Sequence, residues 1–307
     1  MKTVALPFTP DTSVKPQVYH FFDEDTNTFS YIVKDPNSNA CAIVDSVMEL
    51  EYAAGRTRLI GADKIIAFVK EKGWDVEWII ETHVHADHLS AAPYIQEHLG
   101  GKLGIGDHIN VVQETFGKIF NAGTEFQRDG SQFDRLFKDG DSYQVGSMTV
   151  NVLHTPGHTP ACMTYVVRDG EGADAQVAAF VGDTLFSPEV GTARCDFPGG
   201  DAAVLYRSIR RVLALPPATR LYLCHDYPPD GRAPQPVTTV AQQRAANVHV
   251  HDGVAESDFV ALRRARDATL KMPTLILPSV QVNMRAGQLA PAEDNGTRYL
   301  KSPLDVL

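Results

Sequence analysis

Three histidines and one aspartate stand within six consecutive positions, directly after a short apolar run. The run is Trp78-Ile79-Ile80, and the cluster is His83-Val84-His85-Ala86-Asp87-His88. Neutral imidazoles and a carboxylate crowded at a strand end are costly unless something binds them. Their nitrogen and oxygen atoms suit zinc, iron or manganese. A solvated, histidine-rich loop is the alternative, but the complete pattern after a strand favours a metal site.

Three further positions share the character of this cluster, because each is a histidine or aspartate at the end of a short apolar strand, near glycine or proline. They are His158 in the segment 154–159, Asp183 in 180–184 and His225 in 221–226. Each alone is typical of a structural residue or a turn. Loops on a rigid sheet can hold metal ligands in a fixed geometry, so we expect the three to join the cluster at one site.

The pattern of apolar residues and turn residues indicates alternating strands and helices. An interrupted stretch from about 108 to 138 is interpreted as a helical insertion with a loop, which could form a lid over the site. The expected strands are 28–33, 41–44, 76–80, 102–105, 147–153, 163–167, 177–181 and 221–224, and the expected helices are 63–72, 91–99, 111–120, 202–215, 239–246 and 257–270. This order predicts an α/β (α+β) fold with two mixed β-sheets and helices outside, a four-layer αββα sandwich.

Composition excludes some partners. The chain has 307 residues, 43% of them hydrophobic, which is ample for a large buried core. Asp and Glu outnumber Lys and Arg by 38 to 28, for a formal charge of -10, so no nucleic-acid surface is expected. The start of the chain lacks a signal-peptide run, and no stretch approaches the roughly 20 apolar residues of a membrane span. We expect a cytoplasmic protein that does not contact a membrane.

The four cysteines, Cys41, Cys162, Cys195 and Cys224, are scattered without a CxxC spacing. A disulfide framework is therefore not expected, and buried free thiols are the simplest interpretation. Cys195 and Cys224 lie beside candidate site residues. A thiol next to Arg194 has a lowered pKa if it is accessible, and is inert if it is buried.

Together the motifs resemble the metallo-β-lactamase superfamily, whose signature is HxHxDH followed by a His, an Asp and a final His. All seven positions are filled, by His83, His85, Asp87, His88, His158, Asp183 and His225. In the dinuclear hydrolases of this superfamily, such as glyoxalase II, the resemblance implies two zinc ions. One would take His83, His85 and His158. The other would take Asp87, His88 and His225, with Asp183 bridging.

Other segments resemble the persulfide dioxygenase branch, the sulfur dioxygenases similar to the ethylmalonic encephalopathy protein. They are Gly182-Asp183-Thr184-Leu185, Gly191 to Phe197, His225-Asp226-Tyr227 and Asn283-Met284-Arg285. This resemblance implies one Fe(II) per chain, held by His83, His158 and Asp183, a two-histidine, one-carboxylate set that leaves open positions on iron. His85, Asp87, His88 and His225 would then orient the ligands through hydrogen bonds.

The same resemblance assigns substrate contacts to Arg194 and Tyr227. Arg194 suits a glutathione carboxylate by bidentate pairing, and a surface arginine is the alternative. The leading hypothesis is a non-haem Fe(II) dioxygenase that oxidises glutathione persulfide, or a related small persulfide, with O₂ to sulfite and thiol. A dinuclear zinc hydrolase acting on a thioester or lactone is the second hypothesis, and a scaffolding module with a degenerate site is the third.

The domain organisation is expected to be one metallo-β-lactamase-like unit over 1–230 and a C-terminal extension over 231–307 packed on it. There is no internal repeat and no low-complexity linker. The apolar run Leu275-Ile276-Leu277 and the long tail could cover a neighbouring subunit as easily as their own core, so a homodimer is possible.

Overall fold

The first β-sheet is mixed and presents the histidine cluster at one of its edges. The computed structural model describes residues 14–170, 176–228 and 232–306. In this sheet the first three strands are antiparallel and the other three continue in parallel. The strands in spatial order are β1 (Gln17–Asp23), β2 (Thr28–Lys34), β3 (Ala40–Val44), β6 (Asp75–Ile80), β8 (Lys102–Gly106) and β9 (Arg135–Phe137).

The second sheet is also mixed, with one parallel pair, β13 and β14, among antiparallel neighbours. Its strands in spatial order are β10 (Ser142–Val145), β11 (Met148–His154), β12 (Met163–Asp169), β13 (Gln176–Phe180), β14 (Arg220–Tyr222) and β15 (Val237–Thr239). A small third sheet contains β5 (Arg56–Arg58), β4 (Val47–Glu51) and β7 (Leu89–Ser90).

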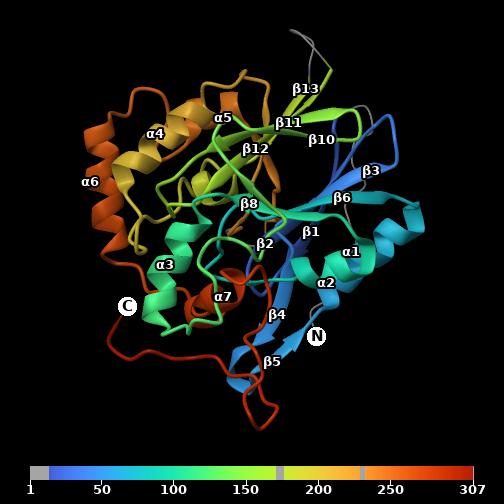
Figure 1. Cartoon of the computed structure of the whole chain (residues 1–307). Coiled ribbons are helices and arrows are strands. Elements are labelled where there is room, and N and C mark those ends of the chain that lie inside the picture. The colour runs from blue at the N-terminus through green and yellow to red at the C-terminus, as the bar shows by residue number, and fades with distance from the viewer. Residues whose placement is uncertain (1–13, 171–175, 229–231, 307) are drawn as a thin grey trace.

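Helices cover the outer faces of the two large sheets (Figure 1). Apolar side chains of α1 (Ile60–Lys72), α2 (Ala92–Leu99), α3 (Ile109–Ile119) and α7 (Ile276–Asn283) pack on the first sheet. Those of α4 (Ala202–Val212), α5 (Val240–Ala246) and α6 (Glu256–Asp267) pack on the second. A third apolar core, with Phe29, Tyr31, Val150, Tyr165 and Phe180, lies between the sheets. The expected four-layer αββα sandwich is thus confirmed.

Some expected boundaries differ from the observed ones for physical reasons. The helix expected over 202–215 ends at Val212, three residues before the expected end. The segment after Met272 leads into α7, a helix that was not expected because the segment contains two prolines. Pro278 stands in the first turn of this helix, where the backbone N–H groups have no partner within the helix, so its missing N–H costs nothing there.

The segment 108–138 contains α3, followed by a loop and then β9. Val112 and Phe116 of α3 are buried in the core on the outer face of the first sheet. Beyond it, α5 and α6 lie over the second sheet and α7 packs beside β7. The expected domain boundary at residue 230 lies outside the described residues. Among the helices described, none is long and apolar enough to cross a membrane.

Candidate metal centre

All seven residues of the signature lie in loops at the same edge of the two large sheets. The loop after β6 carries His83, His85, Asp87 and His88, and a turn after β13, Gly182–Thr184, carries Asp183. His158 lies between β11 and β12, and His225 follows β14. Their ligand atoms form groups within 4.8 Å of one another, one of His83, His158 and Asp183 and another of His85, Asp87, His88 and His225. The structure therefore brings the seven distant positions together, with His85 beside Asp87, His88 and His225 and not in the group of His83 and His158.

The first group presents three donor atoms to one point. His83 Nε2 lies 4.0 Å from Asp183 Oδ2, and His158 Nε2 lies 3.6 Å from the same oxygen. These distances are too long for hydrogen bonds. Ligands around one ion at about 2.1 Å are roughly 3 to 3.5 Å apart, so a small contraction would place all three on a metal. His83 Nε2 is buried without any hydrogen-bond partner, as expected of an atom whose partner is a metal ion.

Hydrogen bonds on the outer side of each ring fix which nitrogen faces the metal. His158 Nδ1 donates to the carbonyl of Arg194 at 2.8 Å, which leaves the lone pair on Nε2. The Thr82 hydroxyl donates to Asp45 at 2.9 Å and accepts from His83 Nδ1 at 3.0 Å. These contacts orient both rings so that Nε2 faces the metal position.

Asp45 is a central residue of the site that sequence reasoning missed. It is buried directly after β3, and its carboxylate also accepts from the Thr82 N–H at 2.8 Å and from His85 Nε2 at 3.0 Å. Its position at the end of the apolar run Ala42-Ile43-Val44 was the signal that could have revealed it, since the other site residues share that position.

The second group is partly joined by direct contacts. His225 Nε2 lies 3.0 Å from Asp87 Oδ2 and 3.3 Å from Asp183 Oδ1, and His88 Nδ1 lies 3.4 Å from Asp87 Oδ1. His85 Nε2 contacts Asp45 and also lies 3.3 Å from Glu81. Two buried nitrogens here, His85 Nδ1 and His88 Nε2, have no hydrogen-bond partner among the described residues. This group can therefore hold a second ion or a set of bound waters.

Burial and neighbouring charges shift the pKa values of these groups in opposite directions. Desolvation, helped by the surrounding histidines, holds the pKa of His83 well below its usual range, so this ring is neutral. Burial opposes ionisation of Asp87, but His225 and His88 outweigh it and lower the pKa of Asp87. Burial would also lower the pKa of His85, but Asp45 and Glu81 outweigh it and raise that pKa.

Two residues outside the loop that carries His83 to His88, the histidine loop, hold it in place. Asn283, at the end of α7, donates to the carbonyls of His85 and His88 at 2.9 and 2.8 Å and accepts from the Ser90 N–H at 2.8 Å. Gly182 has φ +50°, and a Cβ there would lie 2.7 Å from Thr82 Oγ1, so a larger residue would displace the loop.

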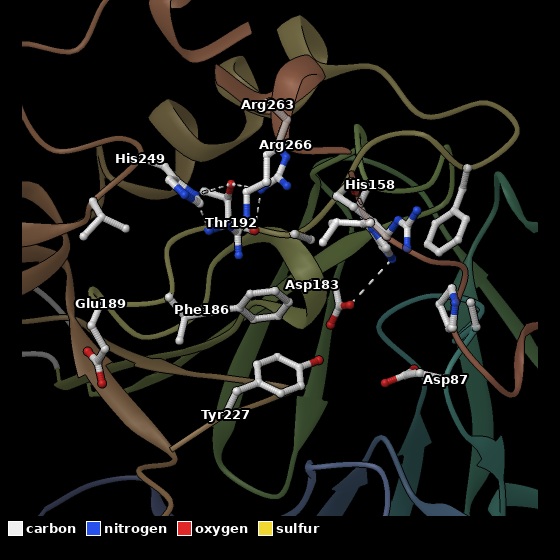
Figure 2. Close-up of a pocket in the computed structure, with 18 residues that line it drawn as sticks. Asp87, His158, Asp183, Phe186, Glu189, Thr192, Tyr227, His249, Arg263 and Arg266 are labelled. Carbon is white, nitrogen blue, oxygen red and sulfur yellow. Dashed lines mark hydrogen bonds and ion pairs between the residues drawn. The ribbon is translucent and has the colours of Figure 1, made fainter. Parts of the chain in front are cut away.

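A pocket of about 560 Å³ opens over the metal centre (Figure 2). That volume is typical of small-molecule sites. His158, Asp183 and Asp87 line it on the metal side, and aromatic walls come from Phe186, Phe197 and Tyr227. None of the described residues 108–138 lines this pocket, so the structure offers no support for a lid formed by that segment.

Tyr227 and Arg194, the two residues expected to contact substrate, both line the pocket, but they differ in how free their side chains are. The ring of Tyr227 is 46% exposed, and its hydroxyl points toward Asp183 in Figure 2. Each nitrogen of the Arg194 guanidinium already has a partner, because Nε and Nη2 each lie 2.6 Å from a carboxylate oxygen of Asp196 and Nη1 donates to the carbonyl of Lys271 at 2.7 Å. Arg194 reaches the metal site through its carbonyl instead.

Cys195 is buried and unpaired, like the three other cysteines. Burial, followed by the charge of Asp267, raises the pKa of its thiol. Of the two alternatives left open by the sequence, the inert buried thiol is therefore the one observed.

Thr192, from the Gly191 to Phe197 segment, also lines the pocket. The rest of this wall comes from the C-terminal part of the chain and was not anticipated; it includes His249 and the α6 residues Arg263 and Arg266. Single charged residues on a helix carry no signal of this kind in a sequence, because only the packing of α6 beside α4 brings them to the pocket.

Comparison with known proteins agrees with this geometry. A model of the metallo-beta-lactamase superfamily matches residues 23–225. The chain is 61% identical over 289 residues to a probable metallo-hydrolase of Burkholderia pseudomallei, covering 94% of this chain and 98% of the relative. It is 47% identical to glyoxylase B2 of Dictyostelium discoideum, covering 96% and 99%.

Two relatives of lower sequence identity are named as a persulfide dioxygenase or as ETHE1, and not as hydrolases. The chain is 28% identical to the human mitochondrial persulfide dioxygenase ETHE1, covering 88% of each chain. The crystal structure of ETHE1 from Myxococcus xanthus superposes with a TM-score of 0.68 at 26% identity, covering 88% of this chain and 99% of that one. The family match, the sandwich and the seven converging ligands together show that the chain belongs to the metallo-β-lactamase superfamily.

Proposed function

We propose that the protein is a mononuclear Fe(II) persulfide dioxygenase. The reaction would be RSSH + O₂ + H₂O giving RSH and sulfurous acid, so that the terminal sulfur is oxidised, O₂ is reduced and the S–S bond breaks. His83, His158 and Asp183 would hold the iron, which when bound would supply the open positions and the redox chemistry that O₂ activation needs.

The observation that carries this proposal is that two dioxygenase-like segments contact the metal centre itself. Asn283 of the Asn-Met-Arg segment binds the histidine loop through three hydrogen bonds. The carbonyl of Arg194, in the Gly191 to Phe197 segment, holds the ring of His158. These are the segments that distinguish the persulfide dioxygenase resemblance from the glyoxalase II resemblance. The distant relationship to ETHE1 supports the same choice.

The contacts of the second group are also compatible with one ion. Asp87 and His225 contact each other directly, and His85 is held through Nε2 by Asp45 and Glu81. In the proposed enzyme these residues orient the ligands and bind water. Phe186 and Tyr227 would flank the sulfur, and the Tyr227 hydroxyl would be available to it as a hydrogen-bond donor.

The test is an oxygen-electrode measurement on anaerobically purified protein given freshly prepared glutathione persulfide. The expected result is O₂ uptake matched one to one by sulfite, with His158→Ala inactive. The proposal would be overturned if the protein consumed no O₂ on addition of the persulfide and instead hydrolysed a glutathione thioester.

A dinuclear zinc hydrolase is the second candidate, favoured by the unpartnered nitrogens His85 Nδ1 and His88 Nε2 beside Asp87. The names of the relatives at 61% and 47% identity point the same way. Two zinc ions would activate water for attack on a carbonyl. This candidate predicts that Asp87→Ala impairs thioester hydrolysis as severely as His158→Ala does.

A further inference from the structure

Three arginines line the pocket, and two of them are already neutralised. Arg194 forms the bidentate pair with Asp196 described above. Arg263 is 1% exposed, its Nε and Nη2 lie 2.9 and 2.7 Å from Asp267, and its Nη1 donates to the Thr192 carbonyl at 3.0 Å. Guanidinium groups whose donors are satisfied in this way have little left to offer a ligand.

Arg266, the third of these arginines, has no carboxylate partner in the part of the chain that the structure describes. It stands in the last turn of α6 and its side chain lines the pocket (Figure 2). The side chain is exposed, and its guanidinium forms no hydrogen bond or ion pair with the described residues. The acidic residues of the pocket wall do not compensate it. Glu189 is paired with Arg232 at 2.9 Å, and Asp87 and Asp183 belong to the metal centre. A free guanidinium in a concave site is suited to a carboxylate.

His249 supplies a second donor on the same wall. Its Nδ1 accepts from the Thr192 N–H at 3.1 Å, so the proton of the neutral ring is on Nε2. Burial, followed by the charges of Arg263 and Arg266, lowers the pKa of His249 to about 4, which keeps the ring neutral near pH 7. Because the His249 ring is neutral and Arg266 is a cation, this wall of the pocket carries a net positive charge.

We propose that Arg266 selects the substrate by binding a carboxylate carried by the non-reacting part of a thiol-derived molecule, with His249 as a neutral hydrogen-bond donor. The identity of the reacting sulfur group rests on the proposed function. The role of Arg266 requires only that this pocket receives the substrate. Arg194, in this arrangement, is a positioning residue that holds His158 through its carbonyl and does not bind the substrate carboxylate.

The kinetic test compares Arg266→Gln with the unchanged protein on two persulfides, glutathione persulfide and the persulfide of glutathione diethyl ester, whose carboxylates are blocked. For the acidic substrate we expect KM to rise about tenfold with kcat within about twofold, since one charge-assisted contact is lost. The KM of the ester is expected to be unchanged by the substitution. Equal effects on the two substrates, or no effect on either, would overturn the proposal.

Arg264→Gln is the matched control, because Arg264 is exposed on the same helix and does not line the pocket. It is expected to behave like the unchanged protein on both persulfides. If Arg264→Gln raised KM as much as Arg266→Gln does, the increase would reflect a general loss of positive charge. That outcome would count against the proposal.

A binding experiment separates this inference from the proposed reaction. Anaerobic titration calorimetry with glutathione, the thiol product, needs no turnover, and we expect about tenfold weaker binding to Arg266→Gln. If that difference is found in a protein that consumes no O₂, the dioxygenase proposal fails and the carboxylate site stands. If O₂ is consumed and glutathione binds both proteins alike, or binds neither, the carboxylate site fails.

Discussion

At the scale of single residues, the metal centre depends on atoms that face away from the metal. The hydrogen-bond chain from His83 through Thr82 to Asp45 fixes one ligand, and the same carboxylate holds His85. Such outer contacts set the orientation and basicity of a ligand. Asp45 is therefore the residue through which two histidines of the loop are coupled.

Replacing Asp45 by alanine is expected to weaken metal binding roughly 10- to 100-fold, because the tautomer of His83 and the position of His85 are no longer fixed. Competition with a chelator measures this affinity. Asp35→Ala is a control for the loss of an aspartate, since Asp35 caps a turn away from the metal centre. Equal metal affinity in the two variants would contradict the role of Asp45.

The candidate metal ligands could be named from the sequence, whereas most of the residues that support them could not. His158, Asp183 and His225 each follow an apolar strand and match a known order, which is information carried by neighbours in the chain. Asp45 follows an apolar run too, but the residues that it supports lie 37 or more positions away, as in its bond with Thr82, and the run does not indicate them. Arg266 lines the pocket only because of the way α6 packs, which no local pattern encodes.

At the scale of elements, α6 and α7 show why the C-terminal part of the chain belongs to the site. The end of α7 binds the histidine loop, and one face of α6 forms a wall of the pocket. A helix over 257–270 was expected, and the observed helix, Glu256–Asp267, confirms it but ends three residues earlier; its contribution to the pocket follows from packing. No helix was expected at α7, where prolines stand on both sides of Leu275 and disfavour a helix.

The pair Arg263 and Asp267 on α6 is buried, so breaking it is expected to be costly. Arg263→Met leaves Asp267 as a buried carboxylate without its main partner, and we expect a loss of about 3–5 kcal/mol in the free energy of unfolding, measured with urea. The double variant Arg263→Met/Asp267→Asn should recover part of it, because the amide is neutral and its oxygen still accepts from the Cys195 N–H.

The exposed neighbour Arg264 again provides the control for α6. Arg264→Met is expected to change stability by less than about 0.5 kcal/mol, as surface substitutions usually do. A similarly small change for Arg263→Met would mean that the buried pair does not stabilise the helix.

At the scale of the whole molecule, the sandwich brings two sheets together so that their loops complete one site. The four layers were predictable, because strand and helix periodicity are local properties and the order of elements leaves few arrangements. The edge strands β1, β9, β10 and β15 were not anticipated. Three of them are short, and β1 alternates only weakly between buried and half-buried positions.

The stability of the molecule is expected to fall as the pH drops from about 6.5 to about 4. Burial lowers the pKa of both His20 and His249 to about 4, whereas an unfolded histidine has a pKa near 6.5. The unfolded chain therefore takes up these protons first, and stability present above pH 6.5 is lost as the pH falls through this window. Urea midpoints across the range measure the effect, and His249→Gln should flatten the profile. An unchanged slope in that variant would contradict the assignment.

In the proposed enzyme, His83, His158 and Asp183 hold one iron and Asp87 only supports them. Metal analysis of anaerobically purified protein and of its Asp87→Ala variant is the most direct test of this arrangement. One iron per chain is expected in both proteins, and none in His158→Ala. Two zinc ions per chain in the unchanged protein, with one of them lost in Asp87→Ala, would contradict it.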